Sequence, residues 1–171
     1  MKKGKKFELT NEFITNMFGT KLFRIRALVE FGDVEAGELG GYVEKESNLG
    51  HDDNAWVYDN AWVYGDAQVS GDARVCGNAR VYGDARVCGN GDYAYAHGFG
   101  SVNRTTTFFR LKDGGVGVRC GCFYGTLAQF RDKIRETHGE SAIAEEYLDL
   151  AALMEKRFRR TGNEQKTEEE S

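Results

Sequence analysis

The sequence predicts a mainly β protein built on a short parallel β-helix. Three observations predict this fold class. Residues 55–90 repeat a six-residue unit, the residues before them have the pattern of β-strands, and the residues after them have the pattern of a hairpin followed by two helices. A period this regular is typical of repeat proteins, in which each unit buries its apolar side against the next.

The repeated unit is Ala-x-Val-x-Gly-Asp/Asn. Alanine recurs at 55, 61, 67, 73, 79 and 85, and valine follows each alanine by two residues. In an extended segment the first and third side chains point the same way, so we expect Ala and Val to face inward and the residue between them outward. Gly-Asp or Gly-Asn allows a turn in every unit but the first, which has Asp59-Asn60. Three strands and three corners make one coil, so strands 18 residues apart should stack.

The repeat is flanked by two segments of different pattern. Residues 1–36 are expected to form an N-terminal β cap around the alternating strand Leu22–Leu28, and residues 37–100 the β-helix, with a two-residue insertion at 50–53. Residues 101–160 are expected to form a hairpin (105–111 and 116–123) and two helices that begin at Thr126 and Ser141. The polar residues 161–171 are expected to be disordered.

Composition and charge limit the possible partners. Hydrophobic residues make up 40% and charged residues 29% of the chain, and no apolar run is long enough to span a membrane. The start lacks the pattern of a signal peptide, and four cysteines are too few for a disulfide scaffold, so we expect a cytosolic protein with no membrane partner. Residues 51–100 hold three arginines against seven aspartates, a difference equal to the whole net charge of −4, so a broad nucleic-acid interface is not expected.

Four segments follow one another in a characteristic order: the strand Leu22–Leu28, the stretch from Gly32-Asp33-Val34 through Glu44 with Asn48-Leu49, the hexads, and the C-terminal residues from Thr106 to Gly139. Over these residues the sequence resembles an uncharacterised group of bacteriophage and prophage hexapeptide-repeat proteins. The resemblance implies a left-handed parallel β-helix, a phage origin, and therefore the cytosol of a bacterial host. It brings no catalytic residues to this chain and permits a role against host defences.

The outward positions of the repeat are the predicted partner-binding or interface residues. Exposed Trp and Arg are typical anchors of protein interfaces, and aromatic rings beside Arg also suit a nucleotide-like ligand. Trp56 over Arg74 and Trp62 over Arg80 are expected to stack across neighbouring coils as cation–π pairs. The full set is Trp56, Trp62, Arg74, Arg80, Arg86, Tyr58, Tyr64 and Tyr82.

Two other sites are weaker candidates. His51 lies in the insertion and is the candidate general base if the protein is a hexapeptide-repeat acyltransferase, although the insertion is short and an exposed loop histidine is the simpler interpretation. Cys120, Cys122 and His138 are candidate zinc ligands. The alternation of residues 116–122 instead places both cysteines on the buried side of the hairpin. We expect no cofactor and no catalytic residue.

The sequence thus favours a non-catalytic phage accessory protein. We expect a homotrimer, because three-sided prisms with sticky faces pack around a threefold axis. It would bind a host protein or sequester a small nucleotide-like ligand, with a role in countering host defence. Two alternatives stay open: the acyltransferase, and a structural protein that assembles end to end.

Overall fold

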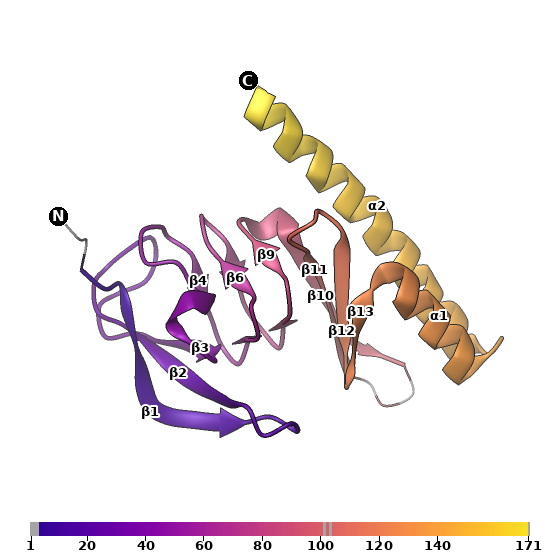
Figure 1. The fold of residues 1–171 in the computed structure, drawn as a ribbon, viewed down its shortest axis with the longest axis horizontal. Coiled ribbons are helices and arrows are strands. Elements are labelled where there is room, and N and C mark those ends of the chain that lie inside the picture. Colours follow the sequence, from indigo (N-terminus) through magenta and orange to yellow (C-terminus); the bar gives the residue numbers. More distant parts are fainter. Residues whose placement is uncertain (1–3, 101, 103, 171) are drawn as a thin grey trace. The chain divides into compact units, whose positions relative to one another are not determined.

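The computed structural model describes residues 4–100, 102 and 104–170, with residues 165–170 described by their backbone alone. The chain is mainly β with two helices and forms two compact units, Met1–Asn90 and Gly91–Ser171 (Figure 1). Within the described residues, neither helix is long and apolar enough to cross a membrane.

The repeat forms six two-residue strands in the first unit. β4 pairs with β7, β5 with β8 and β6 with β9, each in parallel and each at an offset of 18 residues, as in Trp62↔Arg80. The predicted stacking of strands is therefore confirmed. The strands are β4 (Trp56–Val57), β5 (Trp62–Val63), β6 (Gln68–Val69), β7 (Arg74–Val75), β8 (Arg80–Val81) and β9 (Arg86–Val87).

The alanines and valines of the repeat face inward, as predicted. All twelve are at most 1% exposed. The glycines at 65, 71, 77 and 83 turn the corners with φ between 63° and 68°. In the first hexad Asp59 takes the glycine position with φ 54°, and its Oδ2 accepts a hydrogen bond from the backbone N–H of Gly77 in the next coil at 3.0 Å. That bond offsets the strain of a left-handed backbone in a non-glycine residue.

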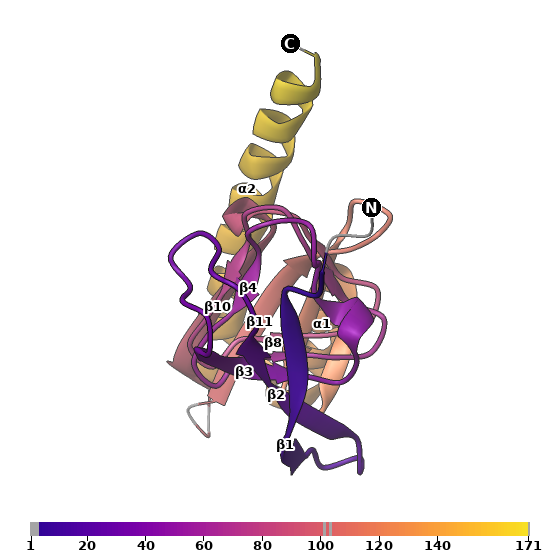
Figure 2. The same cartoon turned by 90° about the vertical axis from the view of Figure 1, so that its left-hand side faces the viewer.

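The N-terminal strands extend one side of the solenoid. β1 (Phe7–Thr15) and β2 (Lys21–Ala27) form an antiparallel hairpin, and β3 (Leu39–Val43) joins it to the repeat. The result is a five-stranded sheet in the order β1-β2-β3-β5-β8, seen from the side of β1 and β2 in Figure 2. β3 pairs in parallel with β5 at an offset of 20 residues (Tyr42↔Trp62), which confirms the two-residue insertion. A short 3₁₀ helix, Glu46–Asn48, follows β3.

The second unit packs two helices against an antiparallel sheet. Its strand order is β10-β11-β12-β13, and both helices contribute to a core with Phe108, Val118 and Phe130. The predicted starts of the helices are confirmed to within one residue, and Thr126 with Gln129 forms the expected capping box. The elements are a 3₁₀ helix (Asn90–Asp92), β10 (Tyr93–Phe99), β11 (Arg104–Arg110), β12 (Val116–Cys120), β13 (Phe123–Thr126), α1 (Leu127–His138) and α2 (Ala142–Glu170).

The structure corrects the predicted hairpin of this unit. Residues 93–99 lie within the predicted repeat region, but they form β10 and pair antiparallel with β11. The predicted strand 116–123 is broken at Gly121, whose φ of 58° turns the chain into β13. The two extra strands complete both edges of the β11–β12 hairpin, so the unit has four strands where the sequence predicts two.

The structure also differs from the predicted disordered tail. α2 continues through Glu170. Thr161 is 6% exposed, and its Oγ1 accepts a hydrogen bond from Nη2 of Arg110 at 3.1 Å, while Gly162 lies near the same guanidinium. These contacts hold the helix against the sheet beyond residue 160, where a polar composition alone predicts disorder.

Candidate functional site

Trp56 is buried, which contradicts its prediction as an exposed interface residue. Its side chain is 0% exposed and makes edge-on contacts with the rings of Phe7 (6.3 Å) and Phe31 (5.3 Å). A Cβ on Gly40 would lie 2.8 Å from the indole, so the absence of a side chain at that position gives the ring its space. The residue does point away from the Ala-Val interior, but the N-terminal segments cover that side of the solenoid. Trp56 is therefore a core residue of the first unit.

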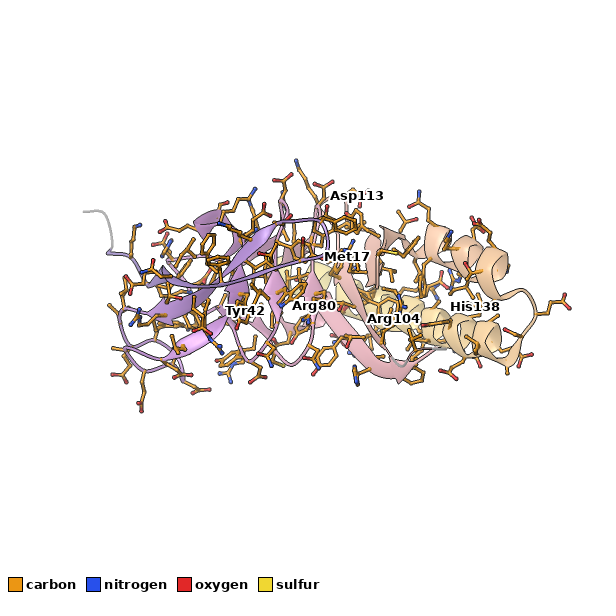
Figure 3. The ribbon with its side chains drawn as sticks, turned by 90° about the horizontal axis from the view of Figure 1, so that it is seen from below. Met17, Tyr42, Arg80, Arg104, Asp113 and His138 are labelled. Carbon is orange, nitrogen blue, oxygen red and sulfur yellow. The ribbon has the colours of Figure 1, made fainter. Side chains whose placement is uncertain are left out.

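The predicted cation–π pair of Trp62 and Arg80 is confirmed. The guanidinium lies 3.9 Å from the centre of the indole ring, and its Nη1 donates to the carbonyl oxygens of Asn60 and Asn78 at 3.0 and 2.9 Å. Burial lowers the pKa of Arg80, and Tyr64 opposes that shift. Tyr42 pairs in register with Trp62 in the same sheet, and Figure 3 labels Tyr42 and Arg80. These contacts join successive coils and leave little of the pair open to a partner.

The other outward residues divide between core and surface. Tyr64 is buried and its ring lies 4.5 Å from that of the half-buried Tyr82. Arg74 pairs with β4 residue Trp56 in register but forms its ion pair with Asp33 at 2.6 Å. The half-buried Arg86 donates to the carbonyl oxygen of Asp66 at 2.9 Å. Tyr58 is half-buried, and burial raises its pKa. The predicted set therefore does not form one open site in this chain.

His51 packs into the N-terminal cap. Its ring stacks on Phe7 with centroids 4.3 Å apart and an angle of 8° between the planes, and its Nδ1 accepts a hydrogen bond from the backbone N–H of Lys6 at 3.1 Å. The residue is half-buried, so the interpretation as an exposed loop histidine is wrong. Both observations describe a histidine that holds the insertion against β1.

The second unit contains a cavity of about 260 Å³. Its floor is apolar, with Phe130, Ile134 and Tyr147 buried and Phe123 half-buried. Its rim carries the cationic side chains of Arg104 and Lys133, both exposed, with the half-buried His138. Cys120, Cys122 and Thr137 complete the lining. An apolar floor below a cationic rim suits a small organic anion.

Arg104 owes its position to a glycine. The residue begins β11, and a Cβ on Gly121 would collide with its guanidinium. Gly121 also has a positive φ, so two separate features of this turn favour glycine. The turn between β12 and β13 therefore leaves room for the planar guanidinium at the rim of the cavity. Figure 3 labels Arg104 and His138, which come from the sheet and from the end of α1.

Tyr147 links the cavity floor to the sheet. Burial, chiefly, together with the neighbouring Cys120 thiol raises the pKa of Tyr147 to about 12, against the pull of Arg104. The phenol lies 3.9 Å from Sγ of Cys120 and 3.4 Å from the carbonyl oxygen of Phe99, to which it donates. A neutral phenol is therefore the stable form across the physiological range, and Tyr147 acts there as a hydrogen-bond donor.

The raised pKa predicts a loss of stability in alkali. The ordinary pKa of tyrosine is 10.0 and that of folded Tyr147 about 12, so the folded protein binds more protons than the unfolded chain between these values. The free energy of unfolding of the second unit should fall as pH rises from 10 to 12, and Tyr147→Phe should remove that part of the fall. Urea denaturation at stepped pH, followed by the far-UV helix signal, measures this, because both helices lie in the second unit. The exposed Tyr124→Phe is the control, and an equal fall in all three proteins would contradict the prediction.

The predicted zinc ligands meet in this cavity. Cys120, Cys122 and His138 all line it, but only Cys120 is buried, and Cys122 is exposed because the chain turns at Gly121. The prediction that both cysteines are buried is therefore wrong for Cys122. Across the part of the chain that the structure describes, no three His, Cys, Asp or Glu side chains are grouped so that they could hold a metal ion.

The sequence does not indicate that Arg104, Lys133 and Tyr147 lie in one cavity. Lys133 and Ile134 are neighbours on α1, so the helix pattern alone could have placed a cation beside the apolar stripe. Nothing in the sequence links Arg104 to that helix, because the link depends on the turn at Gly121. The residues of the cavity come from β11, the β12–β13 turn, α1 and α2.

Comparison with known proteins bears on the repeat. A family model described as the YdcK Beta solenoid repeat matches residues 55–71, 67–79 and 73–89. The three matches overlap and cover the hexads of β4 to β9, which supports a β-solenoid repeat protein. A search of curated proteins finds no match. The cavity lies outside the matched residues, so its chemistry must be inferred from its side chains.

Proposed function

We propose that this β-solenoid repeat protein is a non-catalytic binding protein that holds a small organic anion in the cavity of its second unit. The observation that carries the proposal is the convergence of Arg104, Lys133 and His138 above a floor of Phe130 and Tyr147. Arginine and lysine on a rim neutralise an acidic group, while aromatic side chains below bury an apolar body.

The volume of the cavity limits the size of the nucleotide-like ligand that the sequence predicts. Pockets for drug-sized ligands measure roughly 300–1,000 Å³. A cavity of about 260 Å³ lies just below that range, so it suits a ligand no larger than a mononucleotide. In this proposal the solenoid is a rigid scaffold and the second unit carries the ligand.

The same proposal includes the handedness of the β-helix, the origin and cellular location of the protein, and its oligomeric state. A left-handed parallel β-helix follows from the class of six-residue repeats, and a phage origin with a place in the host cytosol follows from the resemblance over residues 20–160. A homotrimer would display three cavities, and sequestering a small signalling anion is one way to counter a host defence. The alternative of binding a host protein would use the exposed apolar side chains of the N-terminal hairpin, among them Phe13, Met17 and Phe18.

The acyltransferase alternative gains no support from the histidines. His51 stacks on Phe7, and its Nδ1 is occupied by the backbone N–H of Lys6. His97 is exposed on β10, with its Nδ1 at 2.7 Å from Oγ1 of Thr105. His138 lines the cavity, but a volume of about 260 Å³ is small for a pantetheine arm. We therefore assign His138 to ligand binding.

Thermal unfolding of the full chain with a panel of small anions tests the proposal. The panel contains mononucleotides, single-ring acids and coenzyme A, each at a concentration well above the millimolar level. We expect at least one anion of mononucleotide size or smaller to raise the melting temperature, because a ligand bound only by the folded state stabilises it by mass action. In Arg104→Gln the shift should be lost. Arg135→Gln is the matched control, since Arg135 lies on α1 with a 60% exposed side chain outside the cavity lining. A shift that survives in Arg104→Gln, or no shift with any anion, would contradict the proposal.

A further inference from the structure

The identity of the anion follows from the charges around the cavity, and this step rests on the proposed function. Arg104 supplies a planar guanidinium, which matches a carboxylate or a phosphate through two parallel N–H groups. Lys133 forms an ion pair with Glu136, in which the Oε1 of Glu136 lies 3.7 Å from the Nζ of Lys133. Only Arg104 therefore offers a full, undivided cation among the described residues of the rim.

Two negative features lie near this cavity, one at its rim and one beside the lining residue Tyr147. α1 ends at His138, so Thr137 and His138 bring the helix C-terminus, the negative end of its dipole, to the rim. The Glu146 carboxylate lies near Tyr147, and its Oε1 accepts a hydrogen bond from the backbone N–H of Gly100 at 3.0 Å. A doubly charged phosphate would be repelled by both. A singly charged carboxylate pairs with Arg104 and meets less repulsion.

The floor fits an aromatic body. Phe130 lies 5.6 Å from Phe123 and 5.9 Å from Tyr147, and His138 stacks on Tyr147 with centroids 5.9 Å apart at an angle of 28°. A planar ring can extend this cluster by offset or edge-on packing. The half-buried Phe123 and His138 leave part of their rings open for such a contact. The volume of about 260 Å³ limits the body to a small ring system.

We infer that the cavity binds a single-ring aromatic monocarboxylate, and that Arg104, held open by Gly121, is the residue that selects the carboxylate. The ring lies on Phe123 and Phe130 with His138 and Tyr147 beside it. The carboxylate accepts two hydrogen bonds from the guanidinium, and Lys133 adds a weaker attraction.

Isothermal titration of the full chain with three probes that share one phenyl ring and differ in the polar group tests the inference. Benzoate is expected to bind at least about tenfold more tightly than the neutral benzamide, the size of one charge-assisted hydrogen bond. Phenyl phosphate should also bind more weakly than benzoate. Arg104→Lys keeps the charge but loses the fork, so benzoate affinity should fall by about tenfold. Arg135→Lys is the control and should leave it unchanged.

Gly121→Ala probes the position of the guanidinium. Its added Cβ meets Arg104, so benzoate affinity should fall although every polar side chain of the cavity is retained. Because the substitution also strains the turn, the far-UV spectrum and the melting temperature are measured with it. If this variant does not fold, Arg104→Lys still decides the result.

The outcomes separate this inference from the proposed function. Equal binding of benzamide and benzoate would overturn recognition of charge, and tighter binding of phenyl phosphate would overturn the carboxylate. Binding of none of the three probes would overturn the inference, while a shift with another anion in the thermal panel would leave the proposed function standing. Full benzoate affinity in Arg104→Lys would overturn the role of the guanidinium fork.

Discussion

Trp56→Ala is expected to destabilise the first unit by about 3–5 kcal/mol, the usual cost of removing a large aromatic side chain from a core. The indole is 0% exposed and packs between Phe7, Phe31 and Gly40, so its loss leaves a cavity between the solenoid and the N-terminal strands. Equilibrium unfolding in urea measures the cost. Trp62 gives the fluorescence signal of this unit, because the two tryptophans of the chain both lie within it.

Trp62→Ala is the matched control for that substitution. Trp62 occupies the same position of the next hexad but is only half-buried, and its substitution removes the contacts with Arg80 and with the ring of Tyr64. We expect a cost of about 1–2 kcal/mol, measured in this variant through the fluorescence of Trp56. Equal costs for the two variants would show that the N-terminal strands do not cover Trp56.

Lys6→Ala is expected to cost about 3 kcal/mol, because it removes a buried donor from three acceptors. Nζ of Lys6 lies 2.7 Å from the carbonyl oxygen of Ala55, and 3.0 and 3.2 Å from the carbonyl oxygen and Oδ1 of Asp53. In the later coils the equivalent alanine carbonyl accepts a hydrogen bond from the preceding coil. The N–H of Trp56, for example, donates to the carbonyl oxygen of Ala73 at 3.1 Å. β4 pairs only with β7 among the described strands, so Lys6 takes the place of the missing coil. Burial lowers the pKa of Lys6, and Asp53 opposes that shift.

Lys5→Ala controls for the loss of a positive charge. Lys5 is its neighbour in sequence, but its side chain is 62% exposed and it forms a surface ion pair with Glu46. Surface pairs of this kind contribute about 0–1 kcal/mol. Urea unfolding of both variants gives the comparison. A loss for Lys6→Ala no larger than that for Lys5→Ala would show that Lys6 does not cap the solenoid.

The period of the repeat made most of the first unit predictable. The small and β-branched residues at fixed positions define the inward side, and the 18-residue offset, the insertion and the pair of Trp62 with Arg80 follow from counting. The burial of Trp56 was not predictable in the same way. Its hexad is like the others, and the difference lies in Phe7, Phe31 and Gly40, which are far from it in sequence.

The second unit was predictable only through its local signals. The capping box at Thr126 and the apolar stripe from Leu127 to Ile134 identify α1. No local sequence signal identifies β10. It forms because it pairs with the free edge of β11, and that pairing depends on tertiary structure. The cavity depends on the same long-range packing. The sequence pattern of Cys120, Cys122 and His138 suggests zinc ligation rather than this cavity. Arg104, the main cation of the cavity rim, belongs to no sequence motif.

Native mass spectrometry of the full chain, purified gently from a bacterial host, tests the central claim most directly. We expect a discrete oligomer in which each wild-type subunit carries one small organic acid, with that mass missing from Arg104→Gln purified in the same way. The released acid is then identified by fragmentation. A ligand-free wild-type protein from cells, together with no binding of added anions, or a ligand retained equally by Arg104→Gln, would contradict the claim that the cavity is the binding site.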